Sequence, residues 1–133
     1  MTVTFSVAGR KWANLNGSHG SHHAHQALMD EWKALGVAAI KAAKCRPVAA
    51  PVIITATVRR TQNRPADAHN VTPTIKAVID AAVSCGLIED DHDGIVARLI
   101  TEPGPKAKAP TIELRIEPMA TYVLPAYMTG GAV

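Results

Sequence analysis

Aromatic side chains are scarce in this sequence. Phe, Trp and Tyr make up 4% of its 133 residues, whereas hydrophobic residues as a whole make up 47%. The interior must therefore be built mainly from Val, Ile, Leu and Ala. A chain of this length forms one domain and buries roughly two-thirds of its unfolded surface. The sequence thus predicts a single domain over residues 1–133, with residues 118–133 as a C-terminal extension.

Cysteines and long apolar runs are also few. Cys45 and Cys85 lie far apart without CxxC spacing, which argues against a secreted disulfide scaffold and favours reduced thiols. No run of about 18 consecutive apolar residues occurs, so no membrane span is expected. The N-terminal stretch MTVTFSVAGRKW lacks the charged lead and apolar run of a signal peptide. We therefore expect a soluble, cytoplasmic protein.

The charge balance is mildly basic. The formal net charge is +3 and the isoelectric point is about 9.1. Such a balance permits a polyanionic partner such as nucleic acid without demanding one.

The hydropathy pattern predicts an α/β fold with the element order β-α-β-α-β-β. Strand-like segments cover residues 2–8, 52–60, 94–101 and 111–117. A three-to-four-residue apolar repeat predicts one helix over about residues 24–43 and a second helix from residue 72. We expect a single mixed sheet of about four strands, covered by the two helices.

The second helix has the clearest signals. Thr72 is predicted to cap it, Pro73 to occupy its first position and Gly86 to follow its C-terminal end. One face carries a predicted buried stripe, made of Ile75, Val78, Ile79, Ala82 and Val83.

Carboxylates flank this second helix. Asp67 precedes it, and Glu89, Asp90, Asp91 and Asp93 follow it. Clustered carboxylates are what a hard cation such as Mg²⁺ requires, and such a metal can activate water and neutralise charge on a phosphodiester. Solvated acidic turns would give the same spacing, so spacing alone leaves both interpretations open.

Asp67 is the only acid in a basic stretch of the chain. The basic residues between positions 46 and 76 are Arg46, Arg59, Arg60, Arg64 and Lys76. A carboxylate in that setting suits a metal that meets a phosphate backbone.

A longer succession of residues runs through positions 52–101. In chain order it comprises Arg59 and Arg60 at a strand end, Asp67, Asn70, Lys76, Asp80 within a helix, Gly86, and the pair Asp90–Asp91. This succession resembles the signature of the RusA family of Holliday junction resolvases, which are crossover junction endodeoxyribonucleases.

The resemblance implies Mg²⁺-dependent cutting of Holliday junctions and other branched DNA by a homodimer, in recombination and repair. It implies that Asp67 and Asp91 are catalytic metal ligands and that Lys76 acts in cleavage, with Asp90 in support. Contact with DNA is assigned to Lys11, Arg59, Arg60, Arg64 and Asn70.

The sequence departs from the family at two points. His69 stands where the family has its second Asp, and three extra residues separate Asn70 from Lys76. Histidine suits Mn²⁺ or Zn²⁺ better than Mg²⁺, so His69 is a candidate ligand and Mn²⁺ is an alternative metal. The missing charge could come from Asp90 or Asp93. The alternative function is therefore a branched-DNA-binding protein of the same fold with weak or lost nuclease activity.

The flanking acids also bear on assembly. A helix of about 14 residues is roughly 20 Å long, so acids at its two ends cannot hold one metal unless the chain folds back sharply. Two antiparallel copies across a twofold axis would bring Asp67 of one copy near Asp91 of the other. That arrangement predicts two metal sites in a symmetric dimer.

The histidines and tryptophans allow other interpretations. His19, His22, His23 and His25 fall within seven residues, in a stretch predicted to be a loop entering a helix. Imidazole suits zinc or copper, so a metal carrier with no DNA role is a third hypothesis, beside a loop that touches DNA phosphates and a plain polar loop. Two aromatic residues, Trp12 and Trp32, are predicted to pack in the core or at its rim, and stacking of Trp12 on an unpaired base is the alternative.

Overall fold

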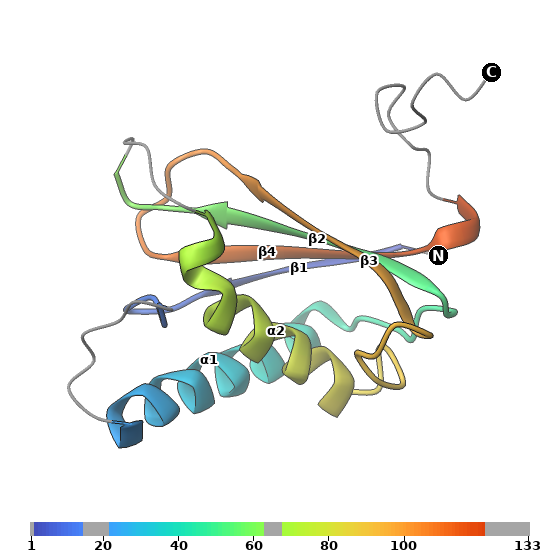
Figure 1. Ribbon diagram of the computed structural model, residues 1–133, viewed down its shortest axis with the longest axis horizontal. Helices are drawn as coiled ribbons and strands as arrows, with labels where there is room; N and C mark the ends of the chain where they lie inside the picture. Colours follow the sequence, from blue (N-terminus) through green and yellow to red (C-terminus); the bar gives the residue numbers. More distant parts are fainter. Residues whose placement is uncertain (1, 15–21, 63–67, 122–133) are drawn as a thin grey trace.

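A computed structural model describes residues 2–14, 22–62 and 68–121, without the side chains of residues 68, 69 and 121. Four strands form one sheet: β1 (Val3–Ala8), β2 (Val52–Arg59), β3 (Val96–Pro103) and β4 (Thr111–Pro118). The helices are α1 (His22–Ala43) and α2 (Thr72–Ser84), with two short 3₁₀ helices, η1 (Ala68–Val71) and η2 (Met119–Thr121). The predicted α/β fold, with its β-α-β-α-β-β order, is confirmed (Figure 1).

The sheet is mixed, with the strand order β1-β4-β2-β3. β4 pairs antiparallel with both β1 and β2, whereas β2 and β3 are parallel. Parallel neighbours need a crossover connection, and α2 lies in the connection between β2 and β3. β1 and β3 are therefore the two edges of the sheet.

Both helices cover the same face of the sheet (Figure 1). Because side chains alternate between the two faces of a strand, every second residue of β1, β2 and β4 points to the helices. These residues form the core with at most 7% exposure: Val3, Phe5, Val7, Val52, Ile54, Ala56, Val58, Ile112, Leu114 and Ile116. The opposite, open face carries mostly polar and charged residues.

The two tryptophans anchor α1 to the segment that follows β1. Trp32 is 1% exposed, and its Nε1–H donates a hydrogen bond of 2.8 Å to the carbonyl of Lys11. Trp12 stacks on Trp32 with ring centroids 5.7 Å apart. Trp32 therefore belongs to the core and Trp12 to its rim, as predicted.

Small and polar residues fix α2 in place. Gly36 of α1 is buried, and a Cβ built there would lie 2.8 Å from the Cβ of Ala81, so the helices touch closely at this point. The hydroxyl of Thr74 is wholly buried; it accepts a bond of 2.8 Å from the N–H of Ala13 and donates one of 2.9 Å to the carbonyl of Ala13. These contacts set where α2 begins relative to β1.

Helix and strand boundaries differ from the predictions at several places. α1 begins at His22, two residues before its predicted start, so His22 and His23 are helical rather than in a loop. The N-cap of α2 is Val71, without a side-chain hydrogen bond. The prediction that Thr72 caps the helix is thus wrong, because η1 leads directly into α2 and a helical turn already precedes it. β3 begins at Val96, two residues later than predicted. A turn precedes it, in which the His92 carbonyl accepts hydrogen bonds from the N–H groups of Ile95 and Val96.

The C-terminal end of α2 agrees with its prediction. Gly86 has a φ of 74°, the left-handed conformation that glycine adopts without strain. Its N–H donates to the carbonyl of Val83, and the N–H of Leu87 donates to the carbonyl of Ala82, both at 3.0 Å. This pair of bonds is a Schellman motif, which ends the helix and reverses the chain.

No helix in the described part of the chain is long and apolar enough to span a membrane. Of the C-terminal extension, residues 122–133 lie outside the described residues.

Candidate functional site

Lys76 and Asp91 form the centre of the candidate site. Lys76 lies on the second turn of α2, and Asp91 lies on the segment that leads from α2 to β3. The ammonium of Lys76 forms an ion pair with Oδ2 of Asp91 and a second ion pair of 3.0 Å with Oδ1 of Asp80. The side chains of Lys76 and Asp91 are 50% and 29% exposed, so a ligand can approach both.

The contact depends on a chain reversal behind α2. After the turn at Gly86, Leu87 and Ile88 are buried, with 1% and 2% exposure, so the returning chain packs against the core. The Val48 N–H donates a bond of 2.8 Å to the Leu87 carbonyl and anchors this segment. Asp91 is thereby carried back along the helix to Lys76.

This reversal removes one argument for two copies. Lys76 precedes the end of α2 at Ser84 by eight residues (84 minus 76), or about 12 Å of helix at 1.5 Å per residue. A single chain therefore brings an acid from behind the helix to its N-terminal half. The close approach of Asp67 and Asp91 between two subunits stays a prediction, because Asp67 lies outside the described residues.

The ion pair shifts the protonation of both partners. The hydrogen bond from Lys76 lowers the pKa of Asp91 below its ordinary value of 3.8. The same bond raises the pKa of Lys76 above its ordinary value of 10.5, aided by Asp80 and against a smaller opposing effect of burial. Both groups are therefore charged throughout the neutral range.

Asp90 orients the backbone at the site. Its Oδ1 accepts a hydrogen bond of 2.8 Å from the N–H of Asp91, a local contact between a side chain and the next backbone amide. Asp90 is exposed and directly precedes Asp91 in the chain. The structure therefore brings together three of the predicted site residues: Lys76, Asp90 and Asp91.

A pocket of about 390 Å³ adjoins the ion pair, between α2 and β3. Its charged lining consists of Lys76, Asp91, Asp93 and Arg98. Its apolar lining consists of Ile79, Val96, Ala97 and Leu99. The volume falls within the range of roughly 300–1,000 Å³ that small-molecule sites occupy, which is ample for a hydrated cation with a phosphate group.

The sequence does not predict that Arg98 and Leu99 belong to the site. Both lie on β3, and the local pattern gives no sign that this strand is an edge beside α2. The one available signal was Arg98 itself, the only charged residue between Gly94 and Thr101.

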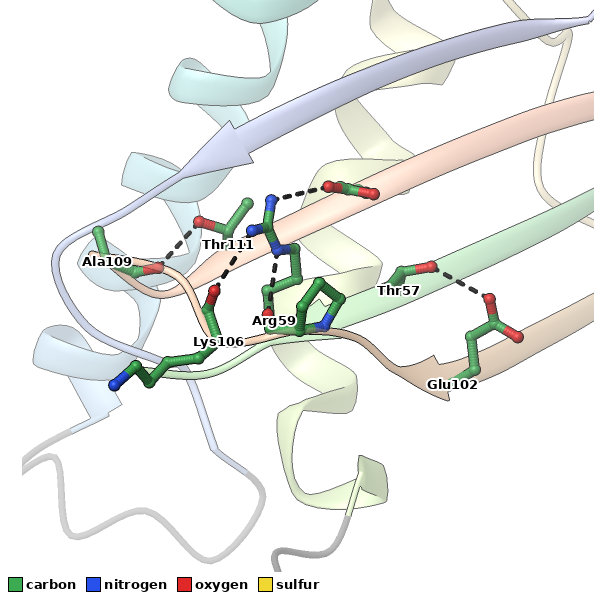
Figure 2. Close-up of polar contacts among 8 residues, drawn as sticks. Thr57, Arg59, Glu102, Lys106, Ala109 and Thr111 are labelled. Atoms are coloured by element: carbon green, nitrogen blue, oxygen red, sulfur yellow. Dashed lines mark hydrogen bonds and ion pairs between the residues drawn. The ribbon is translucent and has the colours of Figure 1, made fainter. Parts of the chain in front are cut away.

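Arg59 lies away from this pocket, on the open face of the sheet. Its Nη1 pairs with Glu113 at 3.0 Å. Its Nε donates to the carbonyl of Pro105 at 3.1 Å, and its Nη2 donates to the carbonyl of Lys106 at 3.3 Å (Figure 2). The guanidinium thus holds the β3–β4 loop, and its contact with DNA stays a prediction.

Close packing supports the same loop. A Cβ built at Gly104 would lie 2.5 Å from Cγ2 of Thr57 and 3.0 Å from Cγ of Arg59, so only glycine fits there without a shift. The Thr57 hydroxyl donates a bond of 3.3 Å to Glu102 (Figure 2).

The other predicted DNA contacts that the structure describes lie around the C-terminal end of β2, away from the pocket. The guanidinium of Arg60 lies over the ring of Trp12, 5.6 Å from its centroid. Lys11 is exposed, while its carbonyl accepts from Trp32, and Asn70 is partly exposed on η1. Arg64 lies outside the described residues.

The predicted metal ligands are only partly placed. Asp67 and the side chain of His69 lie outside the description. Among the residues that are described, no group of three or more His, Cys, Asp or Glu side chains is arranged to hold a metal. In the histidine stretch, the rings of His22 and His23 have centroids 6.3 Å apart at the start of α1, and His19 is not described.

Neither a protein-family model nor a curated protein matches the chain.

Proposed function

We propose that the protein is a metal-dependent endodeoxyribonuclease of the RusA type that cuts Holliday junctions and related branched DNA. One observation carries the proposal: the ammonium of Lys76 contacts the carboxylate of Asp91 at the edge of a pocket. The resemblance in sequence assigns cleavage to Lys76 and metal binding to Asp91. Their contact in the fold supports an assignment that was made for each residue separately.

The donor chemistry fits a hard divalent cation. Asp91 offers a partly exposed carboxylate, and Asp90 and Asp93 lie on the same segment between α2 and β3. Mg²⁺ commonly takes one or two protein carboxylates and completes its shell with water and substrate phosphates. Asp67, and His69 if Mn²⁺ is used, are proposed to complete the protein ligands. The bound ion would supply an activated water and neutralise charge on the phosphodiester.

The ammonium of Lys76 contacts two carboxylates at once, those of Asp80 and Asp91. When it is paired with Asp91 it acts as the counter-ion of that carboxylate. When a cation occupies Asp91, the like charge repels the ammonium, and the ion pair with Asp80 still holds Lys76 beside the pocket. From there the ammonium can bind a phosphate oxygen of the substrate.

The proposed partners are branched DNA and a second copy of the chain. The net charge of +3 permits binding to a polyanion. The homodimer and the cytoplasmic location follow the resemblance and the composition.

The test is cleavage of a synthetic four-way junction in Mg²⁺ or Mn²⁺, measured on denaturing gels. Asp91→Asn should lower the rate by at least about a hundredfold, because a metal ligand is lost. Asp80→Asn, which removes the other partner of Lys76, should cost clearly less than Asp91→Asn because it disturbs only the position of the ammonium. Asp30→Asn, on the exposed side of α1, is the matched control and should retain full activity.

Two results would contradict the proposal. One is a wild-type protein that cuts no branched DNA in either metal. The other is an equal loss of cleavage in Asp80→Asn and Asp91→Asn, which would trace the effect to the environment of Lys76 rather than to a metal ligand.

A second candidate is a branched-DNA-binding protein that does not cut. It is favoured by the ion pair with Lys76, which neutralises Asp91. Tight binding to the junction without cleavage in either metal would support this candidate.

A further inference from the structure

β3 is an edge strand with no strand partner on its outer side among the described residues. An edge strand presents unpaired N–H and C=O groups that can pair with another strand. Leu99 at the middle of β3 faces the helices, in register with Ile54, yet it is 46% exposed. The helix layer therefore stops short of this edge, and both the backbone and an apolar side chain are left available.

We propose that β3 pairs antiparallel with β3 of a second copy of the chain, with Ile100 on the twofold axis. Arg98, Ile100 and Glu102 share the open face, because they stand in register with alternate residues of β2. A twofold axis normal to the sheet keeps this face common to both copies. Residues that oppose each other must then lie on the same face.

The charges of β3 select the register. When Ile100 faces itself, Arg98 lies opposite Glu102 of the partner subunit, and Glu102 lies opposite the partner's Arg98. Opposite charges across a strand pair are favourable and like charges are not. Centring the pair on Leu99 or Thr101 instead would place Arg98 opposite Ile100 or Gly104. Only the register on Ile100 therefore makes the strand complementary to itself.

This pairing involves the candidate site without depending on its chemistry. The pocket is lined both by Leu99, which faces the helices, and by Arg98, whose register places it on the open face, so the pocket reaches the edge of the sheet. A paired strand would add an outer wall to it beside residues 96–99. The second copy would then complete the pocket that holds Lys76 and Asp91.

Charge reversal tests the register through the oligomeric state, measured by sedimentation velocity over a range of concentrations. The wild type should be a dimer. Arg98→Glu and Glu102→Arg should each weaken the dimer by at least about tenfold, since each places like charges opposite one another twice. The double variant should restore it. Arg115→Glu, on the same face of the internal strand β4, is the control and should leave the dimer intact.

A disulfide tests the axis. Opposed Cα atoms in an antiparallel pair lie roughly 4.5–5.5 Å apart, which a disulfide can bridge. In a background with Cys45 and Cys85 changed to Ser, Ile100→Cys should give a covalent dimer on mild oxidation. Ser6→Cys, on the other edge strand, should not.

Three results would overturn the pairing: a wild type that stays monomeric, a dimer unaffected by the charge reversals, or a double variant that fails to recover. Asp91→Asn should remain dimeric, so failure of the nuclease proposal and failure of the strand pairing would be recognised separately.

Discussion

The two edge strands of the sheet differ in how well the helices bury their side chains. In β1, the residues that face the helices, Val3, Phe5 and Val7, are at most 7% exposed. In β3, Leu99 faces the same side and is 46% exposed. α1 packs against β1, whereas a pocket opens between α2 and β3.

The β1 edge therefore contributes mainly to stability, whereas the β3 edge carries the candidate site. At the β1 edge, Trp32 and its neighbours form a closed, dry core. At the β3 edge, charged groups with solvent access lie beside an incompletely buried strand. The β1 edge is thus closed to solvent, whereas a pocket opens beside the β3 edge, and substitutions at the two edges should differ in their effects.

The largest expected effect belongs to the closed edge. Trp32→Ala should lower the free energy of unfolding by about 3–5 kcal/mol, because it removes a buried ring and leaves a cavity. Leu99→Ala, the corresponding truncation at the open edge, should cost less than about 1.5 kcal/mol in the monomer, since the side chain is already half exposed. Urea unfolding of both variants measures the difference. Equal losses would show that the edges are alike.

An intermediate effect is expected at the end of β3, where the loop is packed rather than open. Gly104→Ala should destabilise the protein by about 1–3 kcal/mol, because the new Cβ meets Cγ2 of Thr57 at 2.5 Å. Thr57→Ser removes that methyl group, so the double variant should recover part of the loss. Thermal unfolding of the two single variants and the double variant measures the coupling, and strict additivity would contradict the contact.

The smallest effect is the pH dependence of the Lys76–Asp91 ion pair. The pKa of Asp91 is lowered from 3.8 in the folded state, so its contribution is present above that pH and is lost as pH falls through the lowered value. The pKa of Lys76 is raised from 10.5, so its contribution is present below that pH and is lost as pH rises through the raised value. The pair should therefore stabilise the protein between these limits, by less than about 1 kcal/mol because it is partly exposed.

Substitution of the lysine isolates this effect. The difference in unfolding free energy between wild type and Lys76→Met should shrink when acid protonates Asp91. Lys33→Met, on the exposed side of α1, should give a difference that does not change over the same acid range. A Lys76→Met difference that is independent of pH would show that the ion pair does not persist in solution.

Much of the fold could be predicted because its signals are local. The two-residue period of β4 placed Ile112, Leu114 and Ile116 in the core, where each is 0% exposed. The stripe on α2 is likewise buried, apart from Val83, which is only partly so. Gly86 marked the helix end because left-handed backbone favours glycine.

The site was less accessible from sequence because its contacts are made by distant segments. Asp91 reaches Lys76 only because the buried Leu87 and Ile88 draw the chain back along α2. Arg59 has the sequence context of a DNA contact, yet the strand order places Glu113 within its reach. The order of strands also decides that β3 is an edge, and no local pattern in one sequence determines that order.

The segment from Leu87 to His92, which runs back along α2, is also fixed in length. It is tied at Leu87 to Val48 and at His92 to the start of β3, so the residues between these ties cannot slide. One residue inserted between Gly86 and Asp91 would shift the carboxylate by up to about 3.6 Å, enough to separate it from the lysine while every charge in the chain is kept. Register along this short span, more than the number of acids in it, decides whether the two groups meet.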